Sequence, residues 1–347
     1  MKEVSTIGID LAKSVFQVHG ADDQGHTVFT RKLRRRDVLA FFAKLPPCLV
    51  GMEACATAHH WARELEALGH RVRLLPPRYV KAYVRRGKTD AADAAAIAEA
   101  VTRPALRAVP VKSIAQQSVL MLHRARELLI RQRTQTINAL RAHLAELGLV
   151  APTGHEGLKS LLSSSAAASD GRLPPRARTA RPRLPALLVA PGHEIARPAR
   201  AILVAHREDE ASRRLATVPG IGPVAASALT ATIADARVFR SGRSFAAWLG
   251  LTPRLDGTGG RVTLGPVTKQ GDRYLRRLLV MGAVAVLARV RRQPAQHPWA
   301  AELLGRLKFK AAAVALANKM ARIVWALLAR GESYRPGHRP ARLAAAA

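Results

Sequence analysis

Hydrophobic positions in the first hundred residues follow two alternating patterns. Short apolar runs rich in β-branched residues are bounded by polar residues or proline, which predicts β-strands. Between two of these runs, Trp61, Leu65 and Leu68 recur at helical spacing. Strands that alternate with helices are typical of an α/β domain, which we place at residues 1–108. The predicted strands are residues 5–9, 11–20, 48–53 and 71–75.

The middle of the chain predicts one long helix, after which the helical spacing of apolar residues ends. Residues 114–148 predict this helix, and its Ile137, Leu140, Leu144 and Leu147 follow the alternating spacings of three and four that form a narrow packing seam. Residues 172–200 instead hold seven arginines, six prolines and a single acid. Because proline removes a backbone hydrogen bond and clashes with the preceding turn, we expect no continuous helix there. The helical pattern resumes near Ala205.

Two explanations remain open for this atypical stretch, at about 163–204. A segment rich in Arg, Pro and Ala, flanked by regular sequence, is what a short out-of-frame reading of a GC-rich gene would produce. A genuine basic linker would have the same composition. We assign residues 109–212 to a long-helix or coiled-coil segment that contains it.

The last third of the chain predicts a mainly helical domain, at residues 213–335. Residues 218–229 pair a Gly-x-Gly turn with an Ala-rich helix, and residues 298–332 carry the apolar stripe of a closing helical pair. Residues 252–260 predict a glycine-rich loop before a short strand. Residues 336–347 predict a disordered tail.

The net charge of the chain indicates which class of molecule it binds. Lys plus Arg number 56 against 24 Asp plus Glu, a formal net charge of +32. The natural partner is a polyanion, and nucleic acid fits better than a membrane surface. The longest apolar run, 278–288, is about half the length that spans a bilayer, so no membrane segment is expected. The spacing of Cys48 and Cys55 fits neither a zinc site nor a disulfide framework, which favours free thiols in a reducing cytoplasm.

Four carboxylates fall at predicted strand ends or helix starts. Asp10 and Glu53 each end an apolar run, and Thr89 is a plausible N-cap for a helix that opens with Asp90 and Asp93. Positions three apart lie on one helical face. An isolated pair of this kind is usually a solvated first turn favoured by the helix dipole. Four converging carboxylates instead predict an oxygen cage for Mg²⁺, where two ions about 4 Å apart can clamp a phosphoryl group.

These acids lie in recognisable motifs. GIDLAK, MEAC and KTDAADA resemble the RNase H-like (RuvC-like) domain of the DEDD transposases of the insertion sequence 110 family, to which the Piv DNA invertases are similar. VPGIGP, FAAWLGLTPR, TKQGDRYLRRLL and VALANKMARIVWALL resemble its transposase domain, in the branch named after insertion sequence 1111. The resemblance implies an α/β RNase H-like domain, a coiled-coil segment between protomers and a mainly α-helical transposase domain.

The same resemblance implies the chemistry. It implies transposition by Mg²⁺- or Mn²⁺-dependent cleavage and exchange of double-stranded DNA, at the element ends and a target, guided by an element-encoded RNA. Assembly would be a homodimer or a homotetramer, and the protein would lie in the bacterial cytoplasm with the nucleoid. The metal ligands would be Asp10, Glu53, Asp90 and Asp93. The serine nucleophile of the family falls on Thr258, followed by Gly259, which is a departure from the family pattern.

Further residues are candidates for nucleic-acid contact. A turn through Gly220 and Gly222 can present backbone N–H groups to phosphate at a helix start. Four basic residues after the predicted strand suit phosphate contacts, although a solvated basic helix face explains them nearly as well. They are Lys269, Arg273, Arg276 and Arg277.

Two other functions fit the same residues. A structure-specific junction nuclease would use metal-activated water and no protein nucleophile, which suits intact acids and an absent serine. A defective copy would keep only nucleic-acid binding.

Overall fold

The computed structural model describes residues 3–84, 89–167, 174–176, 183–259, 261–296 and 298–336. The chain forms two compact units. The first comprises Met1–Ile114 with Ile233–Phe239, and the second comprises Ala115–Thr232 with Arg240–Ala347. Apart from its first residue, the predicted tail at 336–347 lies outside the described residues, as does Lys88 of the KTDAADA motif.

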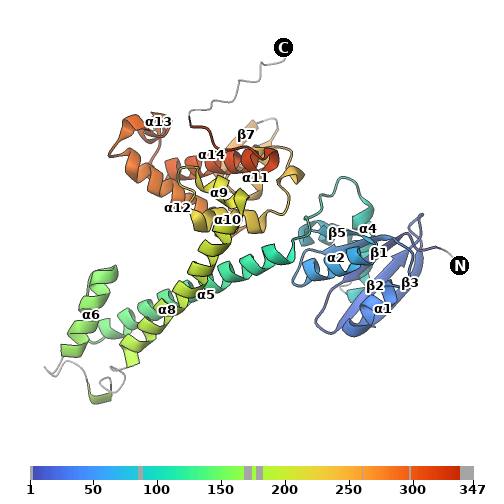
Figure 1. The fold of residues 1–347 in the computed structure, drawn as a ribbon, viewed down its shortest axis with the longest axis horizontal. Helices are drawn as coiled ribbons and strands as arrows, with labels where there is room; N and C mark the ends of the chain where they lie inside the picture. The colour runs from blue at the N-terminus through green and yellow to red at the C-terminus, as the bar shows by residue number, and fades with distance from the viewer. Residues whose placement is uncertain are drawn as a thin grey trace, which may run out of the picture. The chain divides into compact units, whose positions relative to one another are not determined.

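A five-stranded mixed sheet organises the first unit, in the order β3-β2-β1-β4-β5 (Figure 1). Strands β1, β2 and β3 are antiparallel, whereas β1, β4 and β5 are parallel. The predicted alternation of strands and helices is confirmed. The strands are β1 (Thr6–Asp10), β2 (Val15–Ala21), β3 (Thr27–Arg34), β4 (Leu49–Glu53) and β5 (Arg71–Leu75).

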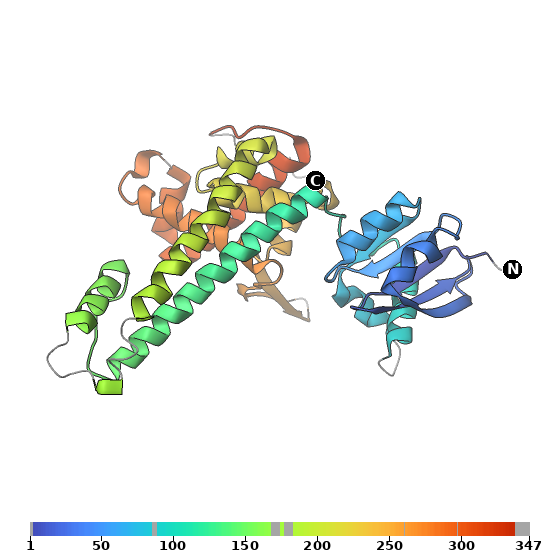
Figure 2. The same cartoon turned by 60° about the horizontal axis from the view of Figure 1, so that its bottom comes forward.

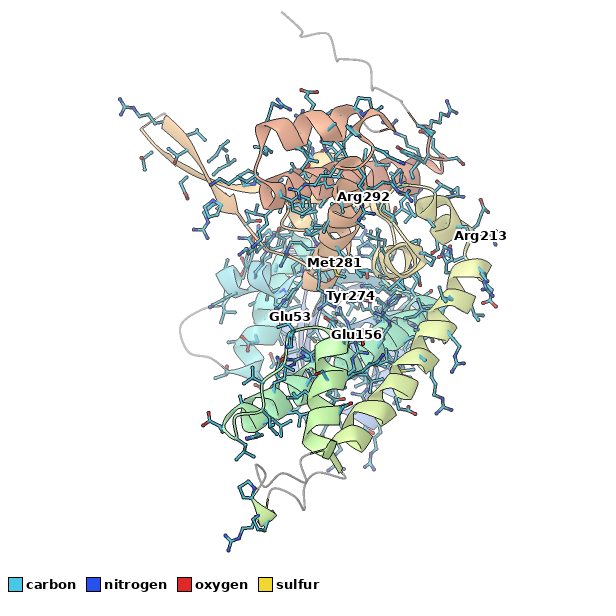
Figure 3. The ribbon with its side chains drawn as sticks, turned by 90° about the vertical axis from the view of Figure 1, so that its left-hand side faces the viewer. Glu53, Glu156, Arg213, Tyr274, Met281 and Arg292 are labelled. Atoms are coloured by element: carbon cyan, nitrogen blue, oxygen red, sulfur yellow. The ribbon has the colours of Figure 1, made fainter. Side chains whose placement is uncertain are left out.

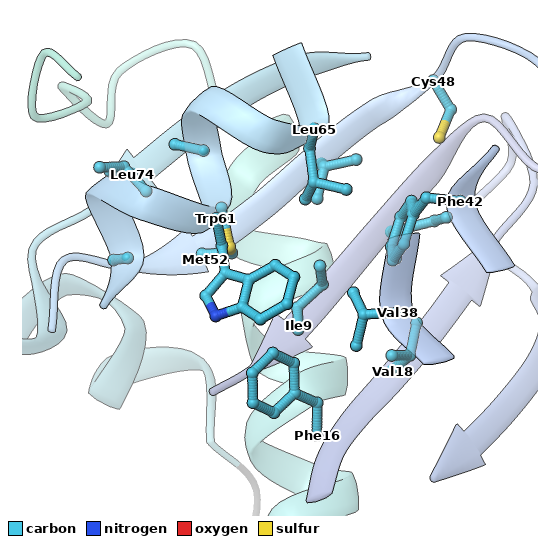
Figure 4. Packing of buried hydrophobic residues seen from close by; sticks show 14 residues of the cluster. Ile9, Phe16, Val18, Val38, Phe42, Cys48, Met52, Trp61, Leu65 and Leu74 are labelled. Atoms are coloured by element: carbon cyan, nitrogen blue, oxygen red, sulfur yellow. The ribbon is translucent and has the colours of Figure 1, made fainter. Parts of the chain in front are cut away.

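Period-two alternation decides which helix covers which face of the sheet. Ile7 and Ile9 face a core shared with α1 (Val38–Phe42) and α2 (Ala58–Ala67), shown in Figure 4. The rings of Phe16 and Trp61 meet edge to face there, with centroids 5.1 Å apart. The intervening Gly8 faces α4 (Asp90–Thr102) on the opposite side. The short elements η1 (Arg35–Asp37), α3 (Pro77–Val80), η2 (Lys81–Tyr83) and η3 (Ala236–Val238) complete the unit.

Helices build the second unit (Figures 1 and 2). The predicted long helix is confirmed as α5 (Ile114–Ala145), and α6 (His155–Ala167) packs on its far end. That end has a small core of its own, formed by Leu140, Leu144, Leu149 and Leu161. The other helices are α9 (Glu210–Ala216), α10 (Pro223–Thr232), α11 (Gly242–Trp248), α12 (Arg273–Val290), η4 (Pro294–Gln296), α13 (Pro298–Arg306) and α14 (Phe309–Arg330).

The prediction that 172–200 lacks a continuous helix is wrong for its second half. Helix α8 (Arg183–Glu208) passes through three prolines. Pro185 lies in the first turn, where the backbone N–H has no intrahelical partner to lose. Pro191 and Pro198 each remove one interior hydrogen bond, which weakens the helix without ending it.

The predicted loop at 252–260 is also corrected. Most of it is strand β6 (Pro253–Thr258), which pairs with β7 (Arg261–Val267) in an antiparallel hairpin. Every side chain of β6 is exposed. Glycine at the turn supplies the backbone freedom that a tight hairpin needs, since Gly259 has a φ of +56°.

Helix α14 is long and apolar enough to cross a membrane by composition, and it is the one such helix in the described part of the chain. Its apolar stripe, however, packs inside the second unit against α11 and α12. Leu316, Met320 and Val324 are all buried there. Helix α14 is therefore a core helix, as the predicted closing stripe requires.

Candidate active site

The first two acids are brought together by strand order. Asp10 is the last residue of β1 and Glu53 is the last residue of β4. These strands are parallel neighbours with Ile9 opposite Met52, so their carboxyl ends reach the same edge of the sheet. Both acids are half-buried.

Glycine lets the third acid approach this edge. A Cβ atom on Gly8 would lie 2.1 Å from the Ala94 carbonyl oxygen and 2.4 Å from the Ala98 nitrogen. Both distances are far below van der Waals contact, so only glycine admits the backbone of α4 this close. A Cβ on Gly51 would similarly meet the Val101 Cβ at 2.8 Å. Helix α4 thus lies directly on β1 and β4, with Asp93 one residue before the contact.

The start of α4 is capped as predicted. The Thr89 Oγ1 accepts a hydrogen bond from the Ala92 N–H at 3.2 Å, and its carbonyl accepts one from the Asp93 N–H at 3.0 Å. Asp90 and Asp93 therefore occupy the first turn, Asp90 exposed and Asp93 half-buried.

The charges that act on Glu53 identify the acids nearest to it. The pKa of Glu53 is raised, first by burial and then by the charges of Asp10 and Asp93. The pKa of the Cys55 thiol is raised by burial and by Glu53, whose carbonyl accepts the Cys55 N–H at 2.8 Å. Asp10, Glu53 and Asp93 thus form one cluster of negative charge, the carboxylate centre. Asp90 is not among the charges that raise the pKa of Glu53.

The carboxylate centre fits a hard divalent cation in its chemistry. Its donors are all oxygens, and a cation would relieve the repulsion that raises the pKa of Glu53. Across the described residues, however, no three His, Cys, Asp or Glu side chains are already close enough to hold one ion. The carboxylates would have to turn towards a shared ion to bind it.

Thr258 belongs to the second unit. It is the last residue of β6, lies opposite Arg261 across the hairpin, and is exposed. Its hydroxyl is therefore accessible near the turn of a two-stranded ribbon.

The Gly220–Gly222 turn lies between α9 and α10, and its first glycine is used for packing. Gly220 has a φ of +87°, and a Cβ on it would lie 2.9 Å from the Gly282 carbonyl oxygen of α12. A Cβ on Gly282 would in turn lie 1.9 Å from the Gly220 oxygen. Gly222 is exposed, and Pro223 opens α10. Gly222 is thus the member of the pair that remains accessible to phosphate.

The four basic candidates divide into two groups. The Arg276 Nη1 donates to the carbonyl oxygens of Leu249 at 2.9 Å and Gln270 at 2.8 Å. Arg277 pairs with Glu127 at 3.2 Å and lies over the ring of Tyr274. These two arginines therefore hold the second unit together, whereas Lys269 and Arg273 are exposed and suited to a ligand.

A buried polar network in the second unit was missed by sequence reasoning. His123 of α5 is fully buried, with its Nδ1 3.0 Å from the Tyr274 hydroxyl and its Nε2 3.2 Å from the Ser227 Oγ. Figure 3 shows Tyr274 on α12. The network joins α5, α10 and α12, and a histidine in an amphipathic helix gives no local signal of such distant partners.

Comparison with known proteins identifies the family of this chain. Residues 7–148 match a family model for DEDD transposases of the IS110 type, described as a transposase. Residues 212–300 match the model described as the transposase IS116/IS110/IS902 family. The probable family 20 transposase of Pseudomonas aeruginosa is 50% identical, over 96% of this chain and 99% of its own length. The chain belongs to the IS116/IS110/IS902 transposase family.

Two named insertion-sequence proteins are also similar to this transposase. The transposase for element IS1328 of Yersinia enterocolitica is 38% identical over 95% of this chain and 98% of its own length. The transposase for element IS1111A of Coxiella burnetii is 36% identical over 97% and 93%. The predicted family and the RNase H-like character of the first domain are confirmed.

Proposed function

We propose that this transposase cleaves and exchanges DNA strands at the ends of its element in a reaction that requires Mg²⁺ or Mn²⁺. The observation that supports the proposal is that Asp10 and Glu53 end neighbouring parallel strands, while Asp10 and Asp93 both act on the charge of Glu53. Asp90, one turn away on α4, completes the proposed ligand set. When bound, such ions stabilise the attacking and leaving oxygens of a phosphoryl group.

The chain's own groups would divide the work. The four carboxylates would hold the ions, and the α4 contact with Gly8 sets the position of Asp93. We assign the nucleophile to Thr258: its Oγ1 forms a bond to phosphorus and loses its proton, while the bond from phosphorus to the leaving strand oxygen breaks. That oxygen takes up a proton.

Partners follow from charge and exposed surface. A net charge of +32 supports binding both to DNA and to an element-encoded guide RNA. Ile114, Met121 and Leu128 are exposed seven residues apart on α5, which supports a coiled-coil contact in a homodimer or homotetramer. We expect the protein to act in the cytoplasm, beside the nucleoid.

An Asp10→Asn variant tests the metal site. It should abolish Mg²⁺-dependent cleavage of element-end DNA and leave DNA binding intact, because the lost charge repelled phosphate. Asp23→Asn, at an exposed acid after β2, is the matched control and should cleave normally. Normal cleavage by Asp10→Asn would refute the proposal.

A further inference from the structure

Strand register places a glutamine beside the carboxylate centre. Asp10 of β1 lies directly opposite Gln17 of β2 in the antiparallel pair. Directly opposite residues carry their side chains on the same face, with Cβ atoms about 4.5–5.5 Å apart. That face is the one covered by α4, since Gly8 contacts α4 and lies two residues before Asp10. Gln17 is therefore a neighbour of Asp10 under the same helix.

The Gln17 amide is buried and incompletely satisfied. Gln17 is 5% exposed, because α4 packs against β2 as well as β1. Among the described residues, its Oε1 has no hydrogen-bond partner. A buried acceptor without a donor costs folding free energy, and an apolar side chain of similar size would avoid that cost.

Two other buried polar side chains of this unit, His70 and Asp22, have hydrogen-bond partners. The His70 Nδ1 accepts the Cys48 N–H at 3.3 Å, and its Nε2 lies 3.1 Å from the Phe42 carbonyl oxygen. The Asp22 Oδ1 accepts two backbone N–H groups. Within the described part of the chain the Trp61 Nε1 also lacks a partner, but it is a donor and lies in the core on the other face of the sheet. Gln17 carries the unsatisfied acceptor on the face of Asp10, and we look for its donor outside the chain.

The chemistry of the neighbourhood selects the donor. The ionised carboxylates beside Gln17 are acceptors only, so they cannot satisfy its Oε1. A water molecule bound to a divalent ion has polarised O–H groups and is a strong donor. Such a water would lie where the ion meets Asp10, within reach of the adjacent strand.

We propose that Gln17 is a positioning residue of the carboxylate centre, whose Oε1 accepts a hydrogen bond from a water molecule bound to the divalent ion beside Asp10. This inference rests on the proposed metal-dependent function. Gln17 touches no reacting atom; it orients the ion's water and, through it, the ion.

The test compares full-length Gln17→Leu, Gln17→Glu and wild-type protein in two measurements. The first is thermal unfolding with and without Mn²⁺, and the second is element-end cleavage across a Mg²⁺ titration. Thr6→Val is the matched control, a polar-to-apolar change on the same sheet face at the opposite end of β1.

Gln17→Leu without metal should melt at the wild-type temperature or about 2–4 °C higher, because the unsatisfied acceptor is gone. Its Mn²⁺-induced stabilisation should shrink, and half-maximal cleavage should need about 10- to 100-fold more Mg²⁺. Gln17→Glu keeps an acceptor oxygen, so it should restore the response to metal while melting lower in its absence. Thr6→Val should respond as wild type.

The possible failures can be told apart. A wild type that responds to metal, with Gln17→Leu responding identically, overturns the role of Gln17 alone. A marked loss of stability in metal-free Gln17→Leu also overturns it, because the amide would then be satisfied within the fold. A wild type indifferent to metal in both measurements overturns the proposed function and this inference with it.

Discussion

The hydroxyl of Thr258 is exposed on a hairpin whose strand has no buried side chain. Compared with serine, threonine keeps the hydroxyl oxygen and adds a methyl group that restricts χ1. A reacting atom misplaced by about 1 Å can lose on the order of 100-fold in rate. Gly257 and Gly259 on either side leave the backbone some freedom to adapt.

Thr258→Ser should therefore cleave faster than the parent, and Thr258→Ala should be inactive, in single-turnover assays with mass analysis of the DNA adduct. Ser241→Ala is a suitable control, since the Ser241 Oγ caps α11 by accepting the Ser244 N–H at 3.2 Å. It should lose about 1 kcal/mol of stability and keep the adduct on residue 258. Equal activity of Thr258→Ala and the parent would favour a junction nuclease that uses water.

A second prediction at the level of a single residue concerns Gly8. Gly8→Ala should destabilise the first unit and separate Asp93 from Asp10, because its Cβ would collide with main-chain atoms of α4. Gly51→Ala should be milder, since its nearest neighbours are side-chain atoms of Val101 and Ile97. Gly305→Ala meets nothing within 4 Å in α13 and should be neutral or stabilising. Thermal unfolding and metal-dependent cleavage should both follow this order, and a harmless Gly8→Ala would contradict it.

At the scale of elements, substitutions of proline can test whether α8 is helical through its prolines. Pro198 is an interior helical residue, so Pro198→Ala should restore a hydrogen bond and stabilise the helix by up to about 3 kcal/mol. Pro185→Ala should gain less, because residue 185 lies in the first turn. The free energy of unfolding, followed by circular dichroism, measures both. Pro174→Ala, outside any named element, is the control, and equal effects at 174 and 198 would argue against the helix.

Local patterns predicted the elements whose partners are near in sequence. The run at 71–75 coincides with β5, and the spacing of leucines in 114–148 predicted α5. Proline content misled the prediction for α8, because single interior prolines weaken a helix without ending it. Glycines at 257 and 259 made β6 resemble a loop, since pairing with β7 is not visible from composition.

Part of the candidate site was equally predictable. Asp10 and Glu53 could be found because each ends an apolar run, and Thr89 because it precedes a helix-forming segment. Gln17 and the Gly220–Gly282 contact could not, because register and helix packing join residues far apart in sequence.

For the whole molecule, acid stability should depend on His123. Burial and the nearby charges of Arg126 and Arg124 lower its pKa to about 4. The folded state therefore keeps this ring neutral, while the unfolded chain takes up a proton near pH 6.5. The stability it contributes is present above pH 6.5 and is lost as the pH falls towards 4, by roughly 3 kcal/mol.

Denaturant titrations between pH 7.5 and 4 should show this loss. His123→Gln should be less stable at pH 7.5, because Tyr274 or Ser227 loses its partner, yet it should depend less on pH over the same range. His59, whose pKa is also lowered to about 4, leaves a residual slope in the variant. If the free energy of unfolding of the parent and of His123→Gln depended on pH in the same way, His123 would not be the source of the loss in acid.

The Gly8 contact also bears on how this protein tolerates sequence drift. Most substitutions change a side chain and leave the main-chain atoms in place. The backbone of α4 lies directly against Gly8 of β1. The spacing between Asp93 and Asp10 is therefore set by backbone contact and not by the volume of core side chains. Exchanges such as Ile for Val in the core under α2 should lower stability in small steps while leaving that spacing unchanged. The spacing of these proposed metal ligands is in this way independent of the size of the core side chains.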